Sequence, residues 1–358
     1  MSAEFVIAAD EEAALEQLHR DNLTDGLPVV IPTRRRVEEM ILASGYEGDV
    51  SLGNVGPSMA AATIDVVAAN AVMAGCLPEH FPVVVAATKC ICDPTYDLTE
   101  TQVTTHPVTP LLIVNGPARE QCGLASGVGA FGPGYRANAA IGRAIRLIMM
   151  NIGGGRPGVS DMSTLGSPAK FSFCAAENEE MSPWPPLHVS RGWRADQSTV
   201  TAITVEGPHS VICAPMPDDL VDMAAPAAIR LLASAVGSLG SNSTYFAQGD
   251  MAIIINPQTA GQLARAGYTR ESLQEELVAR SRHSRKVLRQ HNPLLIQPGP
   301  DDDIGSPRDP KSLVIIVAGS IGGYCMVCPT LGVSLHHHPS VTKEIELNQM
   351  CALPPLLS

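Results

Sequence analysis

The sequence predicts an α/β protein in which mixed or parallel sheets are covered by helices. The chain has 358 residues, of which 45% are hydrophobic and only 17% are charged. Such a composition suits strands that are buried on both faces because helices cover the sheet on either side. Short β-type runs that alternate with alanine-rich helical segments indicate the same fold class.

The N-terminal part begins with two predicted helices. Residues 11–20 form the first, and Thr33 is a suitable N-cap for the second, which Gly45 ends. Residues 1–48 are therefore expected to be a helical and extended segment. It precedes the main α/β domain, which is expected to span residues 49–291.

A β-type run that ends in Gly-Pro and precedes a predicted helix occurs three times. The run and helix of each unit are 50–55 with 58–74, 111–115 with 136–151, and 200–206 with 218–236. The units are unevenly spaced along the chain. The pattern therefore suggests internal pseudo-repeats and not a solenoid.

The C-terminal half continues the same alternation. Residues 251–255 are predicted to form a buried strand, and residues 270–282 a helix capped by Thr269. Prolines, glycines and three consecutive aspartates predict a surface excursion or linker over residues 292–310. Residues 311–358 are expected to return to the same core with a final strand, a glycine loop and a segment rich in cysteine and histidine.

Composition and charge exclude several classes of partner. The formal net charge is -12 and aromatic residues make up only 4%, which argues against a nucleic-acid partner. No apolar stretch is long enough to span a bilayer, and the acidic N-terminus does not resemble a signal peptide. Nine cysteines without a regular framework indicate free thiols in a reducing compartment. We therefore expect a cytoplasmic protein, without a membrane partner, that forms a homo-oligomer.

Three glycine-rich loops suggest a site for an anionic small-molecule substrate. They span residues 126–136, 151–158 and 319–323, and arginines lie in or beside the first two. Glycine lets backbone amides approach an anion, and arginine can hold a carboxylate or phosphate with two hydrogen bonds. The candidate substrate-binding residues are Arg136, Arg143, Arg156, Asn115, Gly322 and Gly323. The alternative is that these glycines only form turns and helix ends.

Two cysteines are candidate nucleophiles. Cys76 precedes a predicted helix start at Pro78, where a thiol pKa is expected to be lowered. Cys325 follows the glycine loop 319–323 and forms a CxxC with Cys328. A CxxC is also compatible with redox chemistry, metal binding or coincidence, and each cysteine could simply be a buried core residue.

Candidate acid–base residues lie in two polar segments. His106 occupies a polar loop ahead of the strand 111–115, where a histidine can exchange protons near neutral pH. Lys170 and Glu177 belong to an acidic segment over residues 161–184, in which neighbouring charges can shift pKa values. The alternatives are a loop histidine satisfied by hydrogen bonds and acids that stabilise a helix start.

A metal site is a second interpretation of the C-terminal segment. His336 and His338 share one face if the chain is extended there, and Cys325 and Cys328 could complete a Cys₂His₂ set. Zinc or iron would be the metal. In the lead hypothesis the protein uses no cofactor.

Four motifs resemble those of a bacterial protein family associated with the UGSC-type selenoproteins. They are DGLPVV at 25–30, NAVMAGCLPEHFPVV at 70–84, TTHPVTPLLIVNGP at 104–117, and GGGRPG with DMSTLGSPAKFSFCAAENEEMSPWPPLHVSRG within 153–192. The resemblance covers roughly residues 25–330 and implies a common fold and an enzyme, but it brings no established reaction. The CxxC stands where the family pattern leads us to expect a Gly-His-Ser type of loop.

Three functions remain open on the sequence alone. The lead hypothesis is a hydrolase- or lyase-like enzyme without nicotinamide or flavin, which uses a reactive cysteine on a small carboxylate- or carbonyl-bearing substrate. The first alternative is a metal-dependent enzyme that uses the C-terminal cysteines and histidines. The second is a non-catalytic partner subunit of a thiol- or selenol-dependent enzyme.

Overall fold

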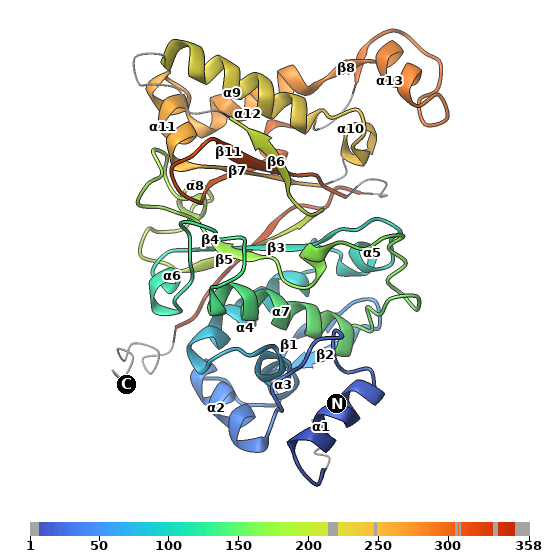
Figure 1. Ribbon diagram of the computed structural model, residues 1–358, viewed down its shortest axis with the longest axis vertical. Coiled ribbons are helices and arrows are strands. Elements are labelled where there is room, and N and C mark those ends of the chain that lie inside the picture. The colour runs from blue at the N-terminus through green and yellow to red at the C-terminus, as the bar shows by residue number, and fades with distance from the viewer. Residues whose placement is uncertain are drawn as a thin grey trace.

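Two four-stranded sheets stack face to face between two groups of helices (Figure 1). The computed structural model describes residues 7–213, 221–246, 249–304, 307, 309–331 and 336–347. Both sheets are mixed, so the predicted α/β class with helix-covered mixed sheets is confirmed.

The first sheet is built around β3 (Thr109–Asn115). β3 pairs in parallel with β4 (Cys174–Ala176) and antiparallel with β5 (Thr199–Val205). β12 (Val341–Glu344) joins the outer side of β5 in the antiparallel sense. The strand order is therefore β12-β5-β3-β4.

The second sheet is built around β7 (Met251–Ile255) and β11 (Tyr324–Cys328), which are antiparallel. β10 (Leu313–Val317) pairs in parallel with β7, and β6 (His209–Ile212) pairs antiparallel with β11. Residues 256–312 separate β7 from β10 in sequence, yet the two strands are neighbours. The late strands β10 and β11 therefore belong to the same sheet as the earlier strands β6 and β7.

The strands β3, β7 and β10 are buried on both faces because each sheet lies between a helical layer and the other sheet. Leu111 and Ile113 of β3 pack between the sheets, whereas Leu112 and Val114 pack against helices. Successive side chains of a strand point to opposite faces, so both sets of alternate residues are buried here. The same alternation holds in β7, where Ile254 lies between the sheets and Ile253 faces the helices.

Helices cover the outer face of each sheet (Figure 1). On the first sheet they are α4 (Phe81–Ile91) and α7 (Arg136–Asn151). The helices α2 (Arg34–Ser44) and α3 (Ile64–Ala74) pack on these two, and α1 (Glu11–Arg20) lies farther out. On the second they are α9 (Val221–Val236), α11 (Pro257–Arg265) and α12 (Arg270–Ser281). Within the ranges described, no helix is long and apolar enough to cross a membrane.

Short elements connect the layers. The helical ones are η1 (Pro78–His80), α5 (Leu98–Gln102), α6 (Ala118–Gln121), η2 (Pro168–Lys170), α8 (Leu187–Ser190), α10 (Asn242–Phe246), α13 (Arg285–His291) and η4 (Pro310–Ser312). The remaining strands form two two-stranded antiparallel sheets. They are the hairpin of β1 (Ser51–Val55) with β2 (Ala60–Thr63), and the pair of β8 (His283–Ser284) with β9 (Asp303–Ile304).

The three strand–Gly-Pro–helix segments do not form equivalent units. β1 pairs with β2 in a hairpin outside both four-stranded sheets, and its helix therefore begins at Ile64 and not at Ser58. β3 and β5 are antiparallel neighbours in one sheet, and β6 intervenes between Gly207-Pro208 and α9. The predicted helix start at residues 218–220 lies outside the described residues, as do residues 1–6 and 348–358 of the predicted terminal segments.

The turn that follows β3 requires glycine at position 116. Gly116 has a φ of +77°, and a Cβ at this position would lie 2.2 Å from the carbonyl oxygen of Gln197. The left-handed backbone alone costs about 1–2 kcal/mol with any other side chain, and the clash adds to this cost. We therefore expect Gly116→Ala to lower the free energy of unfolding by more than about 2 kcal/mol, measured by urea denaturation.

Gly123→Ala is the matched control for this substitution. Gly123 also has a positive φ, +64°, but a Cβ there would meet nothing within 4 Å. Gly123→Ala should therefore lower the free energy of unfolding only by the backbone cost of about 1–2 kcal/mol. Equal losses for the two variants would show that the contact with Gln197 does not matter.

Candidate functional site

The candidate residues divide between the two ends of the sheets. The carboxyl ends of β3, β4, β7 and β10 lie at one end, because Asn178 N–H donates to the Val317 carbonyl oxygen at 2.8 Å. Asn115, Glu177 and Cys325 lie at this end. His106 precedes β3 and therefore lies at the opposite end, which is also where the chain before β7 meets His338.

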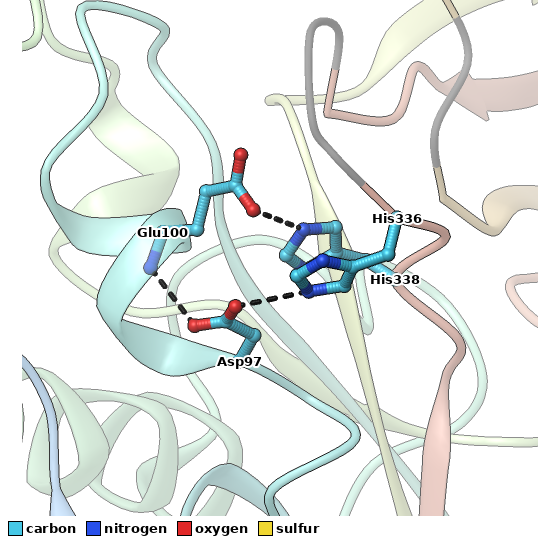
Figure 2. A group of neighbouring side chains, drawn as sticks. All are labelled: Asp97, Glu100, His336 and His338. Atoms are coloured by element: carbon cyan, nitrogen blue, oxygen red, sulfur yellow. Dashed lines mark hydrogen bonds and ion pairs between the residues drawn. The ribbon is translucent and has the colours of Figure 1, made fainter.

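A group of four potential metal ligands lies at this opposite end (Figure 2). Asp97, Glu100, His336 and His338 place one ligand atom each within 4.8 Å of one another. The two carboxylates come from the start of α5 and the two imidazoles from the chain ahead of β12. More than two hundred residues of sequence separate the two pairs.

Each histidine faces one carboxylate. His336 Nε2 lies 3.0 Å from Asp97 Oδ2, and His338 Nε2 lies 3.0 Å from Glu100 Oε2. The two rings stack with centroids 5.1 Å apart. Residues two apart in an extended chain point to the same side, so the predicted shared face of His336 and His338 is confirmed.

The first turn of α5 fixes the two carboxylates. Asp97 is the N-cap of α5, and its Oδ1 accepts a hydrogen bond from Glu100 N–H at 3.2 Å. An N-cap aspartate typically accepts from the third helical residue, which brings the two side chains together on one side of the turn. Oδ1 is thus used for capping, while Oδ2 of Asp97 faces His336.

A backbone carbonyl sets the tautomer of His338. This side chain is buried, and its Nδ1 lies 3.2 Å from the carbonyl oxygen of Tyr96, to which it donates. A neutral ring with the proton on Nδ1 presents a lone pair at Nε2. That lone pair points at the Glu100 carboxylate, so a cation between the two groups would be bound by both.

The chain around His338 is also held in place by Asp250, independently of Asp97 and Glu100. Asp250 N–H donates to the carbonyl oxygen of His338, and the Asp250 carboxylate accepts from Ser340 N–H and Oγ–H. His337 points away from the group and pairs with Asp250 at 3.0 Å, a hydrogen bond that raises the pKa of His337. His336 and His338 therefore face Asp97 and Glu100, whereas His337 between them pairs with Asp250.

The structure does not bring the CxxC cysteines to the histidines or to each other. Cys325 and Cys328 are three residues apart on β11, so they point to opposite faces of the sheet. Cys325 packs on the helix-covered side and Cys328 between the sheets. Burial raises the pKa of Cys328. The predicted Cys₂His₂ set is not formed, because residues an odd number of positions apart in a strand point to opposite faces.

The two candidate nucleophiles differ in their surroundings. Cys76 is buried, and burial raises its pKa, contrary to the expected lowering at a helix start. Cys325 has a lowered pKa, chiefly because Cys213 forms a hydrogen bond to its sulfur. Asn256 Nδ2 also lies 3.4 Å from Cys325 Sγ.

Glu177 belongs to a buried network that ties together chain segments at the ends of β3 and β4. Its side chain is 0% exposed and lies 3.2 Å from Arg270 Nη2. It also accepts from Asn115 Nδ2 at 2.6 Å and from Leu187 N–H at 2.7 Å. Burial raises the pKa of Glu177. Asn115 and Glu177 therefore hold protein groups.

Lys170 lines a separate open pocket with a volume of about 410 Å³. Its ammonium is paired with Asp161 at 2.7 Å, and burial lowers the pKa of Lys170. Arg146 lines the same pocket and donates to the carbonyl oxygen of Lys170. Burial lowers the pKa of Arg146 to about 10.

The three candidate anion-binding arginines contact the protein itself. Arg143 forms a bidentate pair with Asp25, with both N···O distances 2.8 Å. Arg136 donates to the carbonyl oxygen of Gly75, and Arg156 to that of Asn22. Arg143 and Arg156 hold the N-terminal segment, whereas Arg136 holds the turn after α3, where its charge acts on the Cys76 thiol. The three arginines are therefore not assembled around one cysteine.

The remaining candidates lie in loops. His106 Nε2 is 2.7 Å from Glu206 Oε1, at the same end of the sheets as the metal-ligand group. Gly323, in the loop before β11, accepts a hydrogen bond from Cys213 N–H at 2.6 Å. A Cβ at Gly322 would meet nothing within 4 Å. Neither glycine lies beside the candidate arginines.

Asp97, Glu100 and Cys213 belong to these groups but were not predicted from the sequence. The spacing of Asp97 and Glu100, an N-cap acid with a second acid three residues later, was the available signal for the carboxylate pair. No local pattern marks Cys213 as the neighbour of Cys325.

Comparison with protein-family models, curated proteins and solved structures finds no match to this chain.

Proposed function

We propose that the protein is a metal-dependent enzyme of the hydrolase or lyase type, with its metal ion bound by Asp97, Glu100, His336 and His338. The observation that supports the proposal is the convergence of four ligand atoms within 4.8 Å of one another. The cysteine-dependent alternative has less support, because Arg143 and Arg156 bind the N-terminal segment and burial raises the pKa of Cys76.

The ligand set favours zinc, with iron as the second choice. Two imidazoles and two carboxylates suit either metal. Ligand atoms at about 2.1 Å from one ion lie at most about 4.2 Å apart, so the group must contract only slightly. The Nδ1 hydrogen bond of His338 to Tyr96 is the outer contact that usually orients a metal-binding histidine.

The site is accessible to a small substrate. The His336 side chain is 55% exposed, whereas that of His338 is 0% exposed, so one ligand faces solvent and one anchors the group. A bound zinc ion would polarise a carbonyl group and acidify a water molecule. His106, oriented by Glu206, is the acid–base candidate at this end of the sheets.

Zinc binding by the chelator-treated full chain tests the proposal. Elemental analysis and calorimetric titration with Zn²⁺ should give one ion per chain in the wild-type protein. Asp97→Asn combined with Glu100→Gln should abolish this binding. Cys325→Ser combined with Cys328→Ser is the matched control and should bind one ion, because neither sulfur belongs to the group. Loss of zinc in the cysteine variant alone would contradict the assignment.

Turnover is tested separately on the zinc-loaded protein. A panel of ester, amide and phosphoester compounds should reveal hydrolysis that a chelator removes and zinc restores. Glu100→Gln should remove the same activity. Activity that survives in this variant and in the presence of chelator would place the reaction elsewhere.

A further inference from the structure

A pair of thiols lies across strands β6 and β11. In this antiparallel pair Val211 is opposite Cys325 and Ile212 is opposite Tyr324. Cys213 follows β6, and its N–H donates to the carbonyl oxygen of Gly323. Cys213 and Cys325 are thus diagonal neighbours, and both side chains lie on the helix-covered face of the sheet.

The environment makes the two thiols unequal. Cys213 forms a hydrogen bond to the sulfur of Cys325, which lowers the pKa of Cys325 and raises that of Cys213. Asn256, the N-cap of α11, donates through Nδ2 to Cys325 Sγ. Thr259 also forms a side-chain hydrogen bond to this sulfur. Donors at a helix start favour a thiolate, so Cys325 carries the nucleophilic sulfur and Cys213 the proton.

We propose that Cys213 and Cys325 are a redox-active pair that a peroxide converts to a disulfide. The Cys325 thiolate attacks one oxygen of hydrogen peroxide, the O–O bond breaks, and Cys325 sulfenic acid and hydroxide form. Cys213 sulfur then attacks the sulfenic sulfur and displaces its oxygen, which takes the thiol proton and leaves as water. The two sulfurs together lose two electrons, and peroxide gains them. A small-molecule dithiol returns the pair to the reduced state by exchange.

The burial of Cys213 and Cys325 favours oxidation by small molecules over oxidation by large ones. Cys325 is 2% exposed and Cys213 is 3% exposed, while the adjacent Tyr324 is 67% exposed. Both cysteines are therefore buried, and only a small oxidant is expected to reach their sulfurs. Burial instead raises the pKa values of five other cysteines, namely Cys76, Cys90, Cys92, Cys174 and Cys328.

Peptide mapping tests the pair in the reduced full chain. After a brief pulse of hydrogen peroxide and blocking of free thiols, non-reducing digestion and mass spectrometry should yield a Cys213–Cys325 linked peptide that dithiothreitol removes. Cys328→Ser is the matched control and should give the same linked peptide. A Cys325–Cys328 link, or oxidation of other cysteines ahead of Cys325, would overturn the proposal.

The Cys213→Ala variant tests the unequal roles. Without its partner, Cys325 should stop at sulfenic acid, which dimedone labels. The rate of the peroxide reaction should also rise with pH at a higher midpoint than in the wild-type protein, because the thiolate has lost a hydrogen-bond donor. An unchanged midpoint without dimedone labelling would assign Cys213 a packing role only. The wild-type mapping decides the proposal even if this variant is unstable.

Discussion

Replacing Arg270 with methionine is expected to lower the free energy of unfolding by about 3–5 kcal/mol. The side chain of Glu177 is 0% exposed, and Arg270 is its ion-pair partner at 3.2 Å. Removing one partner of a buried pair leaves an uncompensated charge in a region of low polarity. Asn115 and Leu187 still donate to the carboxylate, but neutral donors do not replace the positive charge. Urea denaturation at neutral pH measures the loss.

The size of this loss should depend on pH in a defined direction. Burial raises the pKa of Glu177 from 4.5, and loss of Arg270 should raise it further. Protonation of Glu177 removes the buried charge, so the destabilisation of Arg270→Met should be full at high pH. It should shrink as the pH falls through the raised folded-state pKa, which lies above 4.5.

A double variant separates charge from packing. Glu177→Gln combined with Arg270→Met removes both charges and keeps a polar acceptor for Leu187 N–H. It should recover much of the stability that the single variant loses. A double variant as unstable as the sum of the two single variants would show that the ion pair is not the source of the loss.

Elements with strong local signals were predictable from the sequence. The helix expected at residues 136–151 is α7, and the N-cap Thr33 and the left-handed Gly45 bound α2 as expected. These features depend on side chains close in sequence. The hairpin β1–β2 was missed, because residues expected to start a helix at Ser58 instead turn back as a strand.

The candidate sites were only partly predictable, because they depend on contacts distant in sequence. The pairing of His336 with His338 follows from the two-residue repeat of an extended chain. Their carboxylate partners lie in α5, and no local pattern connects the two segments. The CxxC suggested a pair that strand geometry forbids, and the partner of Cys325 is instead Cys213 on the adjacent strand.

The prediction that arginines beside glycine loops bind an anionic substrate was weak for a different reason. An arginine beside a glycine loop suits an external anion, but it equally suits carboxylates and carbonyl oxygens of its own chain. Arg143 binds Asp25, and Arg136 binds the carbonyl oxygen of Gly75. Sequence alone does not distinguish these partners, because they lie more than sixty residues away.

Replacing His338 with alanine is expected to weaken zinc binding by more than about 100-fold, since loss of an outer contact alone typically costs about 10–100-fold. His338 is the most deeply buried of the four proposed ligands, and its ring is held by Tyr96. Zinc at 100 times its dissociation constant should stabilise the wild-type protein by about 2.7 kcal/mol. At the same zinc concentration this increment should be lost in His338→Ala.

His337→Ala is the matched control for this prediction. His337 is adjacent in sequence but pairs with Asp250 and points away from the ligand group. Its replacement should lower stability slightly in the absence of metal and leave the zinc-dependent increment intact. The increment is therefore compared within each variant, by urea denaturation with and without zinc. If both variants lost the zinc-dependent increment equally, zinc binding would depend on the conformation of the segment and not on the imidazole of His338. The assignment of His338 as a ligand would then be wrong.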